Sequence, residues 1–151
     1  MAADDEDDVL LSTLRLAMGI SVHAADQVGD DVSTVQLRAL TVLSRDPGCN
    51  LGRVAESMGV ALSTASRLVE RLVAADLVDR RTSEANRREV ALRLTPHGAR
   101  TLSRYDALRL EGLLSVLVRL PDDDRSTVMT GLRVLSQANV TPTGWAAPGA
   151  G

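Results

Sequence analysis

Apolar residues recur at helical spacing over the first part of the chain. The pattern predicts a helix from about Asp8 to Val28, preceded by an acidic segment, residues 1–8, whose carboxylates favour the positive end of the helix dipole. The apolar positions are Leu10, Leu11, Leu14, Ala17, Met18, Val22, Ala24, Ala25 and Val28. So wide a stripe is typical of a helix that contacts more than one neighbour.

Capping signals predict two shorter helices next. Ser33 and Gln36 form a capping-box pattern that begins a second helix, and Asp46-Pro47-Gly48 ends it. Asn50 can cap a third helix from Leu51 to Met58. Their buried faces are expected to be Leu37, Leu40 and Leu43 in the second helix and Leu51, Val54, Ala55 and Met58 in the third.

A fourth helix is predicted from about Leu62 to Ala75, after a tight turn at Gly59, where glycine adopts a left-handed backbone at little cost. Its inward residues are expected to be Ala65, Leu68, Val69 and Leu72, and its outer face carries Ser63, Thr64, Ser66, Arg67 and Arg71. A short helix, a glycine turn and a helix with a polar outer face indicate a helix-turn-helix. Hydroxyls can bind phosphates or base edges and arginine can bind guanine, although most such faces are simply solvated.

Two short strands follow, Leu77–Arg81 and Glu89–Leu94, and they predict a β-hairpin that forms the wing of a winged helix. In the second strand, Val90, Leu92 and Leu94 are expected on one side. Arg87 and Arg88 lie at the hairpin turn. We expect them to enter a narrow minor groove, where the negative potential is concentrated; the alternative is a solvated loop.

Two more helices complete the predicted fold. Thr95-Pro96 begins a long helix that ends at about Val118, Pro121 precedes a last helix that ends at about Gln137, and residues 139–151 are expected to form a flexible tail. The predicted fold class is mainly α with a small β-hairpin wing.

Composition and charge fit one helical domain with a basic middle. The 151 residues include 1% aromatics, so Leu, Val, Ala, Ile and Met must form the core. The net charge is −3, yet residues 50–105 carry ten Arg and six acidic residues, whereas the rest of the chain is acidic. The basic segment coincides with the predicted helix-turn-helix and wing, which favours DNA as the partner.

Several classes of function are disfavoured by missing signals. Apolar runs fall short of the roughly 18 residues of a membrane helix, and the acidic start does not resemble a secretion signal. One cysteine and two histidines show no metal-ligand spacing, and Cys49 is expected to be a buried structural residue. There is no phosphate-binding loop or nucleophile motif. We therefore expect a cytoplasmic protein without membrane contact, cofactor, metal or enzymatic activity.

The sequence resembles the MarR family of bacterial transcriptional regulators over about residues 9–138. Three stretches carry the resemblance: Val32–Leu40, Leu51–Leu72 and Leu77–Gly98, the last with Asn-Arg-Arg before the second strand and Leu-Thr-Pro-x-Gly after it. The resemblance implies a homodimeric winged helix-turn-helix protein that binds double-stranded DNA at a palindromic operator. It assigns residues 32–94 to the DNA-binding lobe and residues 9–28 and 96–138 to dimerisation helices.

The family often releases DNA on binding small phenolic or anionic molecules, so an effector pocket is expected between the dimerisation helices and the lobe. Candidates chosen by position are Met18, His23, Leu37, Arg38 and Tyr105. Two departures from the family pattern are Asn86, where Asp is common before the wing arginines, and Ala61-Leu62, where Ser-Pro often opens the recognition helix. Ala is a poor N-cap, which costs about 1 kcal/mol relative to Ser.

The sequence therefore predicts a transcriptional regulator, most simply a dimeric repressor, with activation left open. A winged-helix adaptor that binds protein instead of DNA is the alternative, and the arginine-rich wing favours DNA. A small-molecule-binding enzyme is a third class, disfavoured by the missing pair of nucleophile and base.

Overall fold

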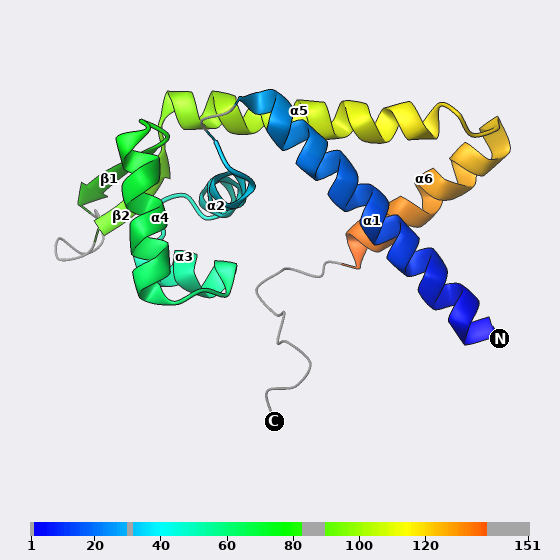
Figure 1. Ribbon diagram of the computed structural model, residues 1–151, viewed down its shortest axis with the longest axis horizontal. Coiled ribbons are helices and arrows are strands. Elements are labelled where there is room, and N and C mark those ends of the chain that lie inside the picture. The colour runs from blue at the N-terminus through cyan, green and yellow to red at the C-terminus, as the bar shows by residue number, and fades with distance from the viewer. Residues whose placement is uncertain (1, 30–31, 83–89, 139–151) are drawn as a thin grey trace. The chain divides into compact units, whose positions relative to one another are not determined.

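The computed structural model describes residues 2–29, 32–82 and 90–138, and these form six helices and one antiparallel hairpin (Figure 1). In chain order the elements are α1 (Ala2–Val28), α2 (Thr34–Arg45), α3 (Leu51–Met58), α4 (Leu62–Ala74), β1 (Val78–Thr82), β2 (Val90–Leu94), α5 (Pro96–Leu117) and α6 (Asp122–Gln137). The chain divides into two compact units, Met1–Leu113 and Leu114–Gly151. The predicted fold class, mainly α with a β-hairpin, is confirmed.

The core of the first unit lies where α2, α3, α4 and the hairpin meet. Leucine and valine side chains from these elements and from Leu77, just before β1, are almost completely buried: Leu37, Leu40, Leu43, Val54, Leu68, Val69, Leu72, Leu77 and Leu92. Among the described residues no polar or charged side chain is buried, so the side chains that join these elements in the core are apolar.

Local capping explains the boundaries of α2 and α3. The backbone N–H of Ser33 donates to Gln36 Oε1 at 2.8 Å, and the Gln36 N–H donates to Ser33 Oγ at 3.3 Å, which completes the predicted capping box. Asn50 Oδ1 accepts from the Arg53 N–H at 2.9 Å, and α3 has the predicted bounds.

The predicted start of α1 at Asp8 is wrong, because the helix begins at Ala2. The residues expected to precede the helix form its first turns instead. Acidic side chains are favourable there, since they face the positive end of the helix dipole. Most of the apolar stripe of α1 is uncovered: Ala24 and Ala25 are buried, whereas Leu10, Leu14 and Met18 are about 60% or more exposed.

The hairpin begins slightly later in both strands than predicted, with Val78 paired to Leu94 and Thr82 to Val90. The outer edge of β2 is also paired, because the Gly48 N–H donates to the Leu92 carbonyl and the Leu92 N–H donates to the Cys49 carbonyl, each at 2.9 Å. Val90 and Leu92, which are expected on one side of β2, differ in burial. Val90 is 50% exposed, since described residues cover β2 at Leu92 but leave its first residue open to solvent.

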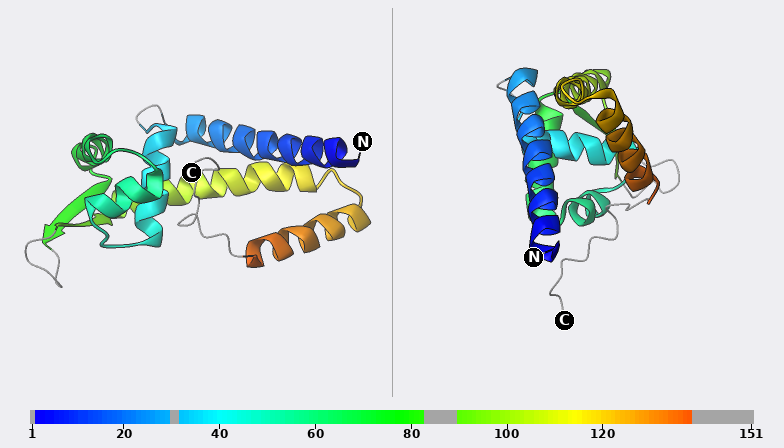
Figure 2. Two further views of the ribbon diagram at one scale, coloured as in Figure 1. Left: turned by 90° about the horizontal axis from the view of Figure 1, so that it is seen from below. Right: turned by 90° about the vertical axis from the view of Figure 1, so that its right-hand side faces the viewer.

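The first turn of α5 is fixed against the start of the hairpin. Thr95 Oγ1 accepts from the Gly98 N–H at 3.0 Å and donates to the Asp76 carbonyl at 2.5 Å. A Cβ added to Gly98 would lie 2.0 Å from the Leu77 carbonyl oxygen, so only glycine permits this approach. Further along, α5 passes beside α1 (Figure 2), where a Cβ on Gly112 would lie 2.9 Å from Ile20 Cγ2.

The helix α6 begins with three acidic residues, Asp122, Asp123 and Asp124, in its first turn, and no residue of it is buried. No helix in the described part of the chain is long and apolar enough to cross a membrane.

Candidate nucleic-acid interface

The helices α3 and α4 form a helix-turn-helix around Gly59. This residue has φ 64° and ψ 37°, the left-handed conformation, and its N–H bonds back to the last turn of α3. The Val60 N–H donates to the Ala55 carbonyl at 3.0 Å, which completes the turn. After the turn, the apolar face of α4 packs on the core and its opposite face is exposed in the described part of the chain.

The outer face of α4 carries the predicted DNA-contacting side chains. Ala65, Leu68, Val69 and Leu72 are buried, as predicted. Ser63, Thr64, Arg67 and Arg71 are exposed, and Ser66 is half-buried. The structure therefore brings these five residues of α4 together on one accessible surface, which we call the α4 face.

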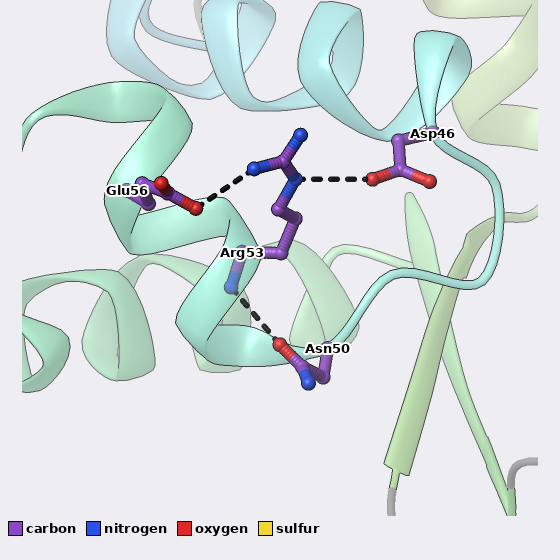
Figure 3. A network of polar contacts seen from close by, with 4 residues as sticks. All are labelled: Asp46, Asn50, Arg53 and Glu56. Atoms are coloured by element: carbon purple, nitrogen blue, oxygen red, sulfur yellow. Dashed lines mark hydrogen bonds and ion pairs between the residues drawn. The ribbon is translucent and has the colours of Figure 1, made fainter. Parts of the chain in front are cut away.

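Two other exposed arginines of the lobe, Arg53 and Arg81, are paired with carboxylates. Arg53 of α3 places its Nη1 2.8 Å from Glu56 Oε2 and its Nε 3.5 Å from Asp46 Oδ2 (Figure 3). The hydrogen bond to Glu56 is the main cause that raises the pKa of Arg53. In β1, Arg81 Nε lies 2.7 Å from Asp79, which likewise raises the pKa of Arg81.

By contrast, Arg67 and Arg71 form no ion pair with any residue in the described ranges. With Thr64, Glu70 and Ala74 they line a shallow recess along α4. Two unpaired guanidinium groups beside exposed hydroxyls are suited to binding phosphates and guanine edges.

Sequence reasoning missed an acidic residue on this surface. Glu70 lines the recess with Arg67 and Arg71, and its Oε1 accepts a hydrogen bond from Ser66 Oγ at 3.1 Å. The signal was present in the sequence, since Ser66 and Glu70 are four residues apart and neighbours on a helix surface.

A second hollow, with a volume of about 430 Å³, lies between the start of α3, the start of α4 and the hairpin. It is lined by Asn50, Leu51, Gly52, Leu62, Ser66, Val69, Arg80, Val90 and Leu92. The exposed residues Leu62 and Arg80 are further candidates for contact with a ligand that spans α4 and the wing. The sequence shows Arg80 only as one of many arginines in the basic segment.

The predicted wing and effector residues are not brought together on one described surface, unlike those of α4. The wing residues Asn86, Arg87 and Arg88 lie outside the described residues. Among the effector candidates, Leu37 and Tyr105 belong to the buried core, whereas the side chains of Met18, His23 and Arg38 are exposed.

Cys49 is buried beside α3, as predicted. Burial raises the pKa of its thiol, and the carboxylate of Asp46 adds to the effect, although Arg53 acts in the opposite direction. Such a thiol is largely protonated at neutral pH, which fits a structural residue.

The sequence of the chain is similar to known transcriptional regulators. A sequence profile of the MarR family matches residues 30–89. The chain is 32% identical over 111 residues to the HTH-type transcriptional regulator YfiV of Bacillus subtilis, covering 72% of this chain and 68% of that protein.

Solved structures share the fold. The crystal structure of RV1404 from Mycobacterium tuberculosis is 30% identical, with a TM-score of 0.80 and coverage of 91% of this chain and 94% of that one. A mutant of MepR from S. aureus, bound to an oligodeoxyribonucleotide, has a TM-score of 0.68 at 15% identity, covering 88% of this chain and 96% of that one.

Proposed function

The chain belongs to the MarR family of DNA-binding transcriptional regulators, and on this premise we propose that it is a dimeric repressor of a palindromic operator. It would occlude a promoter in the cytoplasm and have no catalytic activity. The observation that carries this proposal is the α4 face, where exposed hydroxyls and two arginines that pair with no carboxylate of the described residues lie opposite a buried apolar face.

We assign DNA contact to seven residues: Ser63, Thr64, Ser66, Arg67, Arg71, Arg87 and Arg88. The residues of α4 would enter the major groove, with Arg67 reading a base and the hydroxyls binding phosphates or base edges. The wing would reach the adjacent minor groove, with Arg88 inserted and Arg87 bracing the hairpin. The DNA-bound MepR structure supports such use of the fold.

A homodimer is proposed because one lobe presents a single recognition helix. Two lobes can read half-sites about one helical turn apart, which gives specific affinity and a palindromic site. The exposed apolar residues of α1 support this assignment, since they need a partner surface. Residues 9–28 and 96–138 are the proposed dimerisation helices, and residues 32–94 are the proposed DNA-binding lobe.

Selection of genomic fragments by the purified protein, followed by gel shifts on the enriched duplex, tests the proposal. We expect binding that weakens steeply with salt, since arginines displace counterions from phosphates. Arg67→Ala should reduce operator affinity by about 1–3 kcal/mol, whereas Arg45→Ala, which removes the same charge from α2, should change it little. No salt-dependent shift on any duplex would instead favour a winged-helix adaptor that binds protein.

The wing is tested separately. Arg88→Ala should reduce operator affinity by about 1–3 kcal/mol and remove any preference for A·T flanks, with an unchanged melting temperature. Equal binding of A·T- and G·C-flanked operators by wild type and variant would refute the minor-groove assignment.

We also propose regulation by a small phenolic or anionic effector. Bound near Met18, His23, Leu37, Arg38 and Tyr105, it would lower operator affinity by about 1–3 kcal/mol, a typical coupling free energy. A ligand screen that finds neither a thermal shift nor release of DNA would indicate regulation by the amount of protein instead.

A further inference from the structure

A carboxylate on a surface that faces DNA needs an explanation, because phosphates repel it. We propose that Glu70 determines specificity by accepting a hydrogen bond from the N4 amino group of a cytosine in the operator. The inference rests on the proposed function, since it requires that α4 enters the major groove.

The position of Glu70 on α4 places it toward the DNA. The four buried residues of the helix, Ala65, Leu68, Val69 and Leu72, define the side that packs on the core. At 3.6 residues per turn, the opposite side carries Ser63, Arg67, Glu70 and Ala74 in one row. Glu70 therefore lies in the same outermost row as the arginine proposed to read a base.

The hydrogen bond from Ser66 holds the carboxylate in place. Ser66 is half-buried at the edge of the core and donates to Oε1 of Glu70 at 3.1 Å. The bond restricts the Glu70 side chain and leaves Oε2 available to accept from a ligand. Glu70 forms no ion pair with a described arginine, although Arg67 lies three residues before it. Its negative charge is therefore not neutralised within the described part of the protein.

The chemistry of the major groove selects the partner. Only cytosine N4 and adenine N6 present donors there, and adenine adds the N7 acceptor beside its amino group. A carboxylate is repelled by that acceptor, so cytosine is the preferred base. Guanine and thymine would present an acceptor or a methyl group to Glu70, and the carboxylate would be desolvated at the interface without a donor. Glu70 thus rejects wrong sites as well as binding the right one.

The spacing of Glu70 and Arg67 on α4 limits how far apart the two bases that they read can lie. Three residues of helix rise about 4.5 Å, which is between one and two base-pair steps of about 3.4 Å each. We therefore expect each half-site to contain a guanine read by Arg67 and a cytosine read by Glu70, no more than about two base-pair steps apart.

Selection from a randomised duplex library tests this with four proteins: wild type, Glu70→Ala, Glu70→Gln and the control Glu6→Gln. Glu6 is an exposed residue in the first turns of α1, outside the proposed dimerisation helices and DNA-binding lobe, so the control removes the same charge away from α4. Wild type and control should select the same cytosine. Glu70→Ala should lose preference at that position alone, and Glu70→Gln should shift it toward adenine, whose N6 and N7 match an amide.

A base analogue tests the hydrogen bond itself. Replacing the selected cytosine with 2-pyrimidinone, which lacks the amino group, should weaken wild-type binding about tenfold and leave Glu70→Ala binding unchanged. Circular dichroism melts establish that each variant is folded. If Glu70→Ala selects the same cytosine with the wild-type preference, the inference is wrong. If wild type selects no sequence at all, the proposed function has failed instead.

Discussion

At the scale of the residue, Gly98 has the least room of the described glycines. A methyl group there would overlap the Leu77 carbonyl oxygen, which belongs to the backbone and cannot rotate away. Gly98→Ala should therefore lower the free energy of unfolding by at least about 2 kcal/mol, as overpacking at a rigid contact does. Urea denaturation followed by circular dichroism measures the loss.

Gly52→Ala is the matched control. Its new Cβ would meet only Asn50 Oδ1, at 3.4 Å, an ordinary contact. Because alanine has the higher helix propensity, this variant should match or exceed wild-type stability by up to about 1 kcal/mol. Equal losses in the two variants would show that the Gly98 contact is not the cause.

The uncapped start of α4 offers a stabilising change. Ala61 has the extended backbone of an N-cap, with φ −63° and ψ 148°, but makes no side-chain hydrogen bond. A serine there could accept from a free N–H of the first turn, so Ala61→Ser should raise the free energy of unfolding by about 1 kcal/mol. A rise in denaturation midpoint is expected, and Ala61→Val, which cannot cap, should show none.

The buried thiol of Cys49 makes the free energy of unfolding depend on pH. Because burial raises the pKa of Cys49 in the folded state, the unfolded chain loses the thiol proton first, above about pH 8.5. The stabilisation that comes from keeping this thiol protonated is fully present below that pH. It is lost as the pH rises toward the pKa of Cys49 in the folded protein. Between about pH 8 and 10, wild type should therefore lose more stability than Cys49→Ala. Parallel pH profiles of the two proteins would contradict this.

At the scale of the element, Arg104 joins two helices of the first unit. Its Nη2 donates to the Gln27 carbonyl at 3.1 Å, in the last turn of α1, which contains no basic residue of its own. A cation at a helix C-terminus is favourable, so Arg104→Met should speed hydrogen exchange in the last turn of α1. Arg100→Met, one turn earlier on α5, should leave that exchange unchanged.

Elements whose signals are local could be predicted from sequence. The bounds of α3 follow from Asn50 and Gly59, which act on the backbone within a few residues, and the prediction matched the structure. The exposure of Val90 could not be predicted, because alternation places a residue on a face but does not say whether anything covers it. The prediction that α1 starts at Asp8 was wrong because acidic residues are equally compatible with a first helical turn and with a preceding coil.

In the candidate site too, features with a local sequence signal could be predicted and features set by distant contacts could not. The exposure of Ser63, Thr64 and Arg67 follows from the periodicity of α4, and the structure agrees. Glu70 and Arg80 were missed because their importance depends on which charges are already paired. The neutralisation of Arg53 by Asp46 joins residues from two segments of the chain, and no local pattern contains it.

At the scale of the whole molecule, exposed apolar residues require a partner. Leu14 of α1 is 60% exposed within one chain, and α6 in the second unit exposes Val134 and Leu135. Light scattering at micromolar concentration should give twice the mass of one chain. Leu14→Glu should shift this toward the monomer, whereas Val35→Glu, a similarly exposed position on α2, should not. A monomer that retains operator binding would refute the dimer.

The junction at Thr95 and Gly98 has a mechanical consequence. The first turn of α5 touches the backbone of Leu77 with no intervening side chain, and Thr95 clamps Asp76 on the same segment. Soft side chains would absorb a small displacement, but backbone in direct contact transmits it. Any tilt of the long helix about this pivot must therefore carry the hairpin stem along. Thr82 and Val90, the described residues at the far end of that stem, then move the furthest.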